Sequence, residues 1–246
     1  MALYYRTQGF IFKKEDRSES DREFSIFTED FGRVQVFGKA IRKIASKLRG
    51  GIEIFSLSEI EFIQGKNKKT LTDAAFLETF GYIAESPCKF VLAYKMGALV
   101  DAFVREQEQD IAIYGILKDT FLRLNDPELQ PSQSSLLYCC FFWNFVSLLG
   151  YAPELSMCAA CNQKLNPRSL YFSNREGGVI CNMCEATRKE AAGIMPDTVK
   201  VLRLMLNKNW DTVKKLKIDN AIKNALKEVS ENYMTYLINS HAAQPT

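Results

Sequence analysis

Two pairs of cysteines constrain the fold of this chain more than any other feature of its sequence. Cys158 and Cys161 form the first pair, in CAAC, and Cys181 and Cys184 form the second, in CNMC. This spacing is typical of a site in which four thiolates bind one zinc ion. If both pairs meet at one metal, the chain between them must fold back on itself as a small compact module.

The residues at the two turns agree with this interpretation. Asn162 follows the first pair, where a metal-binding turn commonly needs a positive φ, which asparagine tolerates. Gly177 and Gly178 favour a tight turn before the second pair, and LYFSN between the pairs predicts a strand. Two alternatives stay open: a redox-active Cys-x-x-Cys pair, which would expect a βαβ setting, and thiols without a ligand. Four protein thiolates leave no open coordination position, so a zinc ion bound here, one per chain, is expected to be structural.

Composition indicates a soluble globular protein, with 47% hydrophobic and 25% charged residues. No secretory signal pattern is visible, and an odd number of seven cysteines is typical of a reducing cytoplasm. Cys88, Cys139 and Cys140 are expected to be buried thiols. The apolar run at 136–152 is short for a membrane span and contains two polar residues, so it predicts a buried helix and no membrane association.

Strand patterns fill the first 70 residues. DFG at 30–32 predicts a hairpin over 22–38, and GIEIFSLSEIEFIQG predicts a further long strand region. Five short strands in about 75 residues favour a small closed barrel, which leaves no free edge. From Asp73 the apolar spacing changes to three and four residues, which is typical of helices.

These patterns predict an α+β protein with three parts. A five-stranded β-barrel is expected over residues 1–75, and an all-α helical domain over 76–154 and 187–246. The zinc-ribbon-like four-cysteine module, residues 155–186, is expected as an insertion between helices of that domain.

No catalytic motif accompanies the cysteines. His241 is the only histidine, so histidine-based acid–base catalysis is not expected. The sequence contains no P-loop, no G-x-S-x-G and no G-x-G-x-x-G. The acid-rich stretch EDRSESDRE is expected to be a solvated loop. We therefore predict a protein that is not an enzyme, with a zinc-ribbon nuclease whose carboxylates escape recognition as the alternative.

Positive charge is the main functional signal. The segment 33–49 contains six cations and no acidic residue, and a second basic group lies at 66–69. Cations of this kind neutralise phosphates, and aromatic rings can stack on bases. The predicted DNA-binding residues are Arg33, Lys39, Arg42, Lys43, Lys47, Arg49, Lys66, Lys68 and Lys69, with Phe27 and Phe37 as base-stacking candidates. The alternatives are a solvated basic face and two core phenylalanines.

Several stretches together carry a family resemblance: TQGFIFKKEDRSESDREFSIFTEDFGRVQVFGK, SKLRGGIEIFSLSEIEF, FVSLLGYAPELSMCAAC and YFSNREGGVICNMC. With this order of elements, the chain resembles the RecO family of bacterial recombination mediators and DNA-repair proteins from about residue 6 to 206. The resemblance implies that the N-terminal barrel is an OB-fold and that a zinc module is inserted in a helical domain.

The same resemblance implies a function. It implies binding of single- and double-stranded DNA and annealing of complementary strands without ATP, in the cytoplasm and near the nucleoid. The implied partners are RecR and the C-terminal tail of single-stranded-DNA-binding protein, and through them RecA, which is loaded on coated DNA. Some relatives in the family lack the cysteines, which fits a structural role for zinc.

Overall fold

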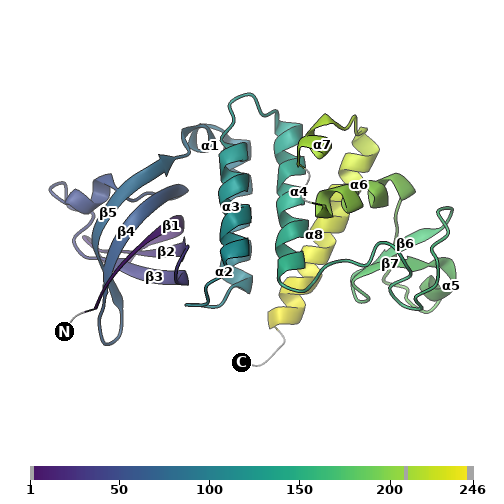
Figure 1. Cartoon of the computed structure of the whole chain (residues 1–246), viewed down its shortest axis with the longest axis horizontal. Helices are drawn as coiled ribbons and strands as arrows, with labels where there is room; N and C mark the ends of the chain where they lie inside the picture. The colour runs from purple at the N-terminus through teal and green to yellow at the C-terminus, as the bar shows by residue number, and fades with distance from the viewer. Residues whose placement is uncertain (1–2, 208–209, 243–246) are drawn as a thin grey trace. The chain divides into compact units, whose positions relative to one another are not determined.

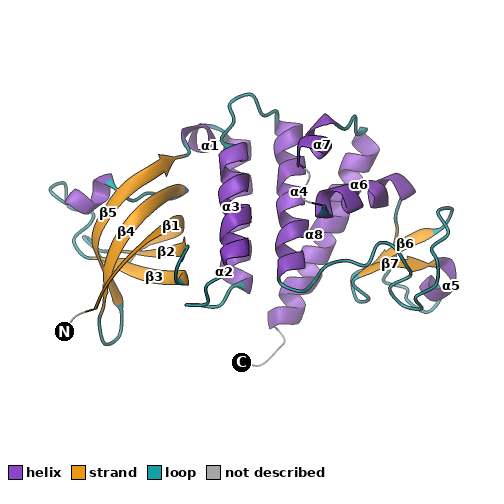
Figure 2. Cartoon of the chain, in the orientation of Figure 1, coloured by secondary structure: helices purple, strands orange, loops and turns teal. Residues whose placement is uncertain are grey.

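A computed structural model of the chain describes residues 3–207 and 210–242. Strands dominate its N-terminal part and helices the remainder, and the segment 170–193 contributes a second small sheet (Figure 2). The chain divides into two compact units, Met1–Pro131 and Ser132–Thr246. We call them unit 1 and unit 2 and describe each by itself. The domain boundaries expected from the sequence remain predictions.

Unit 1 begins with a closed five-stranded barrel, as the sequence predicted (Figure 1). The strands follow the order β1-β2-β3-β5-β4, and β2 and β3 form the predicted hairpin. A short parallel pairing of β3 with β5, at Val36 and Lys69, closes the barrel. The strands are β1 (Leu3–Asp16), β2 (Arg22–Thr28), β3 (Gly32–Gly38), β4 (Ser56–Gln64) and β5 (Lys69–Thr79).

Alternation along the strands separates two layers of apolar side chains. Ile11 lies in a buried cluster to which all five strands contribute, together with Phe24, Val36, Ile60 and Leu71. The neighbouring residues of β1 point the other way, and the ring of Phe10 packs on Phe121, with centroids 5.3 Å apart. Phe121 belongs to the helical layer of unit 1, which consists of α1 (Gly81–Glu85), α2 (Pro87–Phe103) and α3 (Ile111–Leu124).

The start of the helical region was predicted too early. Residues from Asp73 onward show helical spacing, but β5 continues to Thr79 and pairs with β4, for example Ser58 with Phe76. Register shifts in this pairing, one of them between Glu61 and Phe62, mark bulges that disturb the regular alternation expected of a strand. Long-range pairing with β4 therefore outweighs the local pattern.

Unit 2 packs its helices around Trp143, which has no exposed surface. The indole Nε1 donates a hydrogen bond to Ser230 Oγ (2.9 Å), and the ring stacks on Tyr233 at 5.3 Å. Asn144 donates to the carbonyl oxygens of Cys140 and Met205, which explains a polar residue within an apolar helix. The helices are α4 (Pro131–Leu148), α6 (Pro196–Leu206), α7 (Trp210–Lys215) and α8 (Asn220–Ala242).

The apolar run at 136–152 forms most of α4 and is largely buried. Within residues 3–207 and 210–242, no helix combines the length and the hydrophobicity needed to cross a membrane. Cys139 and Cys140 are buried, as predicted. The prediction for Cys88 is wrong, because this residue lies on the exposed side of the first turn of α2.

Candidate functional site

The four cysteines lie in a small module of unit 2, which here means the segment from Glu154 to Ile194. Its sheet has the strand order β7-β6-β8 and consists of β6 (Leu170–Ser173), β7 (Gly178–Cys181) and β8 (Ala192–Gly193). The short helix α5 (Asn182–Glu185) follows β7 directly in the chain. Phe172 of β6 packs edge-on against Trp143 and Tyr233, with centroids 5.9 Å and 5.6 Å away. The module thus shares its buried side with the helical core.

All four sulfur atoms converge, as the spacing predicted. The Sγ atoms lie within 4.8 Å of one another, and those of Cys161 and Cys181 are 3.9 Å apart. Zn–S bonds of about 2.3 Å in a tetrahedron place the sulfurs about 3.8 Å apart. The donor set therefore fits one soft divalent cation and is consistent with zinc binding. In the part of the chain that the structure describes, these cysteines are the only group of three or more His, Cys, Asp or Glu that could hold a metal ion.

Local backbone geometry brings the two pairs together. Asn162 adopts a φ of +57°, as predicted, and its N–H donates to the carbonyl oxygen of Cys158 at 2.8 Å. Gly177 adopts a φ of +66°, and a Cβ at Gly178 would lie 2.3 Å from the Glu154 carbonyl oxygen. Only glycine fits at this close approach, so the turn before the second pair depends on both glycines.

The thiols strongly perturb one another. Burial raises the pKa of Cys158, but hydrogen bonds from the N–H groups of Cys181, Cys161 and Ala160 outweigh it and bring the pKa to about 6. The neighbouring Cys161 sulfur raises the pKa of Cys184 to about 12. Four sulfurs this close resist carrying four negative charges at once, so full deprotonation requires a cation among them.

The predicted DNA-binding cations form the second candidate site, on unit 1. Most of them are exposed. Arg33 and Arg42 form ion pairs, but within the described residues no carboxylate lies within 4.0 Å of the charged groups of the other seven. These unpaired cations are Lys39, Lys43, Lys47, Arg49, Lys66, Lys68 and Lys69. Unpaired cations remain available to phosphate groups, because they give up no ion pair on binding.

Three loops meet at one end of the barrel, and we call residues 16–22, 39–43 and 65–69 the loop cluster. Asp21 joins the first two loops, because its Oδ1 accepts the backbone N–H of Ala40 at 2.8 Å. Arg42 adds to this contact: its N–H donates to the carbonyl oxygen of Ser20, and its Nη1 donates to that of Ser18, both at 3.0 Å. Arg42 also forms an ion pair with Asp16 at 3.4 Å, so the basic segment after β3 is held by hydrogen bonds to main-chain groups and by this one ion pair.

The third loop joins through Lys68 and Phe37. The Lys68 Nζ lies 3.6 Å from the centroid of the Phe37 ring, which is only partly buried. The hydrogen bond from Ala40 lowers the pKa of Asp21, and the positive charge of Lys68 contributes to the same shift. A partly exposed ring with a cation above it and lysines on both neighbouring loops is an arrangement suited to single-stranded nucleic acid.

Two predicted residues are engaged within the fold itself. Arg33 is 16% exposed and forms ion pairs with Asp101 of α2 and, at 3.9 Å, with Glu106, so its guanidinium serves the contact of β3 with that helix. Phe27 has no exposed surface. In this structure Phe27 cannot stack on a base, because its ring is part of the core.

Lys47 and Arg49 lie on the 3₁₀ helix η1 (Lys47–Gly50), away from the hydrogen bonds of the loop cluster. The chain passes close to β5 directly after η1, since a Cβ at Gly51 would lie 1.8 Å from the Ala74 carbonyl oxygen. Both cations are exposed there.

Sequence reasoning missed the acceptor that organises the loop cluster. Asp21 lies in an acid-rich stretch that was expected to be a solvated loop. Ala40 adopts a φ of +53°, which alanine rarely does, so no residue preference pointed to a turn there. The only sequence signal for this site was the charge pattern of the neighbouring lysines.

Comparisons with known proteins agree with this architecture. Residues 1–80 match the family model described as recombination protein O N terminal, and residues 86–242 match the model described as recombination protein O C terminal. The DNA repair protein RecO of Dehalococcoides mccartyi is 33% identical over 218 residues, covering 89% of this chain and 84% of the relative. The DNA repair protein RecO of Pelotomaculum thermopropionicum is 25% identical over 232 residues, covering 94% and 88%.

Proposed function

Since this chain belongs to the RecO family of DNA-repair proteins, we propose that it is a recombination mediator that acts by binding DNA and not by catalysis. It binds single- and double-stranded DNA and anneals complementary strands. With RecR it helps to load RecA on DNA coated by single-stranded-DNA-binding protein, whose C-terminal tail it contacts. On this proposal the protein works in the cytoplasm, on DNA of the nucleoid.

One observation carries the DNA-binding part of this proposal: the unpaired lysines of the loop cluster around Phe37. Lys39, Lys43 and Lys66 have no carboxylate partner among the described residues, and Lys68 lies over the Phe37 ring. Binding of phosphates at such cations releases condensed counterions, so DNA affinity falls steeply as the salt concentration rises. Stacking on one ring is tolerant of sequence, which suits a protein that anneals any complementary strands.

The metal site belongs to this proposal in a structural role. We propose that Cys158, Cys161, Cys181 and Cys184 hold one zinc ion per chain. Bound zinc would supply four coordinate bonds and no open position for a substrate. The chain's own contribution is the backbone geometry at Asn162 and Gly178, which brings the pairs together.

Charge reversal tests the DNA-binding proposal. We expect Lys43→Glu combined with Lys68→Glu to lower affinity for single-stranded DNA at least about tenfold and to reduce its salt dependence, because two phosphate contacts are lost. Fluorescence anisotropy with a labelled oligonucleotide measures the affinity, and a strand-annealing assay follows the activity. Lys118→Glu combined with Lys164→Glu changes exposed lysines elsewhere by the same charge and serves as the matched control.

Two results would count against the proposal. Equal loss of affinity in both double variants would point to net charge instead of a defined surface. Metal-dependent degradation of DNA by rigorously purified protein would instead support the nuclease alternative. Annealing on DNA coated with single-stranded-DNA-binding protein, with and without RecR, tests the partner assignments separately.

A further inference from the structure

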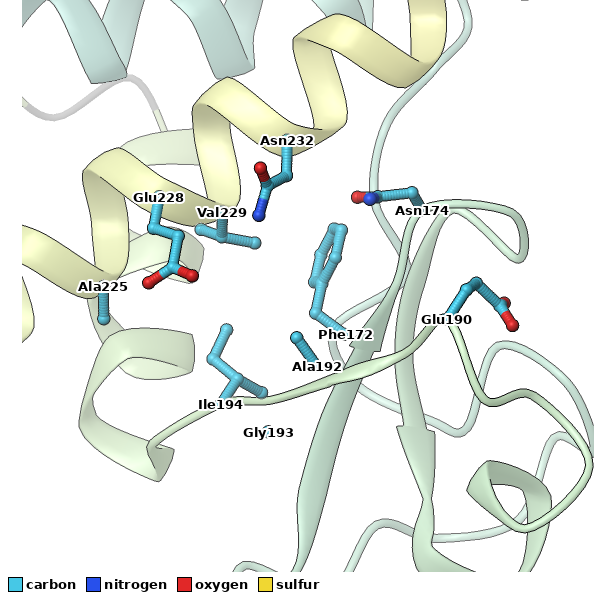
Figure 3. A pocket seen from close by; sticks show the side chains of 10 residues that line it. All are labelled: Phe172, Asn174, Glu190, Ala192, Gly193, Ile194, Ala225, Glu228, Val229 and Asn232. Carbon is cyan, nitrogen blue, oxygen red and sulfur yellow. The ribbon is translucent and has the colours of Figure 1, made fainter.

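A small cavity lies within unit 2, between the cysteine module and α8 (Figure 3). Its volume is about 100 Å³, enough for the end of one apolar side chain. Phe172, Ile194 and Val229 supply its apolar walls, with two alanines beside them. It lies apart from the four sulfurs and from the loop cluster, so neither proposed site uses it.

One wall of the cavity is the open edge of the small sheet. β8 pairs only with β6, through Gly193 opposite Tyr171 and Ala192 opposite Phe172. Because the N–H of Ile194 donates to Leu170 on β6, strand alternation turns the N–H and C=O of Gly193 toward the free edge. Ala192 and Gly193 are exposed, and a Cβ built at Gly193, which would project from the face of the sheet, meets no atom within 4 Å, so the space over this strand is open.

Polar side chains border the cavity without partners of their own. The amides of Asn174 and Asn232 lie near each other beside the Phe172 ring, and Glu228 lies one turn earlier on α8 (Figure 3). Within residues 3–207 and 210–242, none of these three side chains forms a hydrogen bond or an ion pair with the chain. Both charged residues that line the cavity, Glu190 and Glu228, are acidic.

We propose that this groove binds an extended peptide segment of a partner protein, carrying an apolar side chain next to a lysine or arginine. The segment adds a strand to β8 and forms main-chain hydrogen bonds with Gly193. Its apolar side chain enters the cavity between Phe172 and Val229. Asn174 and Asn232 hydrogen-bond the peptide main chain, and Glu228 pairs with the cation.

The chemistry of the groove selects against other occupants. An acidic peptide would place carboxylates beside Glu190 and Glu228, where like charges repel each other. Nucleic acid meets the same repulsion through its phosphates, and no lysine or arginine lines the cavity. Because β8 is only two residues long, few main-chain bonds form, and binding should be weak and dependent on the two side chains.

Titration of the full ¹⁵N-labelled chain with a capped peptide of alternating lysine and valine tests this inference. We expect shifts of the Gly193 and Val229 amide signals and saturable binding. Replacing each lysine of the peptide by glutamate should abolish the shifts. Glu228→Lys should weaken binding about fivefold, the effect of one exposed ion pair, while Glu85→Lys, an equal change at an exposed acid of unit 1, should not.

Gly193→Val supplies the decisive variant. A Cβ at this position meets no atom of the chain within 4 Å, and Gly193 lines the cavity, so the added valine carbons occupy space that the peptide needs. The variant should therefore keep its thermal stability and its DNA affinity but lose peptide binding. Three results would each overturn the inference: no binding of the basic peptide, equal binding of the acidic peptide, or binding that Gly193→Val leaves unchanged. Because DNA affinity is measured on the same samples, failure of this inference is distinct from failure of the proposed function.

Discussion

The loop cluster of unit 1 and the cysteine module of unit 2 solve the same problem by different means. Each must hold irregular loops in one conformation. In the loop cluster, Asp21 accepts a main-chain N–H and Arg42 donates to two carbonyl oxygens. In the module, the loops instead meet at four cysteine sulfurs that lie within 4.8 Å of one another.

The difference lies in what each solution needs from outside the chain. Hydrogen bonds between a carboxylate and main-chain groups are complete without a ligand, and they leave the lysines of the loop cluster free. The four thiols, in contrast, need a cation before all of them can ionise, since the pKa of Cys158 is lowered to about 6 and that of Cys184 is raised to about 12. The comparison therefore predicts that unit 1 tolerates metal removal and that unit 2 does not.

Metal removal gives the largest expected effect. Chelation, or Cys181→Ser, should destabilise unit 2 by at least about 3 kcal/mol, because metal binding and folding are coupled in four-thiolate sites. The two tryptophans, Trp143 and Trp210, both lie in unit 2, so tryptophan fluorescence during thermal unfolding reports on this unit alone. DNA affinity of the same samples reports on the loop cluster and should persist.

Cys88→Ser is the matched control, because it removes an exposed thiol of unit 1 and should change neither signal. Equal melting temperatures for wild type and Cys181→Ser would refute the structural role of the metal. Simultaneous loss of DNA affinity would instead refute the independence of the two regions.

Arg33 and Lys43 should respond in opposite ways. Arg33→Gln leaves Asp101 without its ion pair and should cost unit 1 about 1–2 kcal/mol, with little change in DNA affinity, because that guanidinium is mostly buried and already paired. Lys43→Gln should leave stability unchanged, weaken single-stranded DNA binding about threefold and reduce the salt slope by about 0.7. Urea unfolding followed by circular dichroism, with anisotropy titrations at several salt concentrations, separates the two outcomes. If Arg33→Gln lowered DNA affinity as much as Lys43→Gln, Arg33 would have to be counted among the DNA-binding residues.

The sequence predicted what local rules control. Cysteine spacing, a tolerated positive φ at Asn162 and a hairpin over 22–38 all follow from the residues at those positions, and the structure confirms them. The predictions were wrong where contacts between distant segments of the chain determine the structure. β5 extends past Asp73 because β4 offers it a partner, and Phe27 is buried because the barrel closes around it.

The functional surfaces show the same division. Charge alone indicated the lysines, since exposed cations need no partner in the fold. The contribution of Asp21 could not be predicted, because its acceptor contact is with Ala40, which lies on another loop and has an unusual φ. The groove beside β8 was equally hidden, because it exists only where α8 packs near an edge strand of two residues.

Alanine substitutions of two acidic residues in the same loop should change DNA affinity in opposite directions. Asp21→Ala and Glu19→Ala each remove one negative charge from the loop cluster, but only Asp21 accepts a main-chain hydrogen bond. Glu19→Ala should raise DNA affinity slightly, because repulsion of phosphate falls. Asp21→Ala should lower affinity about threefold, because the 39–43 segment loses conformational order that binding must then restore. Affinity that rises equally in both variants would show that Asp21 acts by charge alone.

The smallest effect concerns pH and isolates the same carboxylate. The hydrogen bond from Ala40 lowers the pKa of Asp21, so the contact is stabilising above the unfolded pKa of about 3.9 and is lost as pH falls through the lower folded value. Between pH 5 and pH 8 the loop cluster should therefore not change through Asp21. The Ala40 amide proton shift in NMR should titrate with a midpoint below about 3.9, and Glu19→Ala should leave that midpoint in place. A midpoint at or above the value of an unperturbed aspartate would mean that the hydrogen bond does not hold the ionised form, and the loop cluster would then need another explanation for its order.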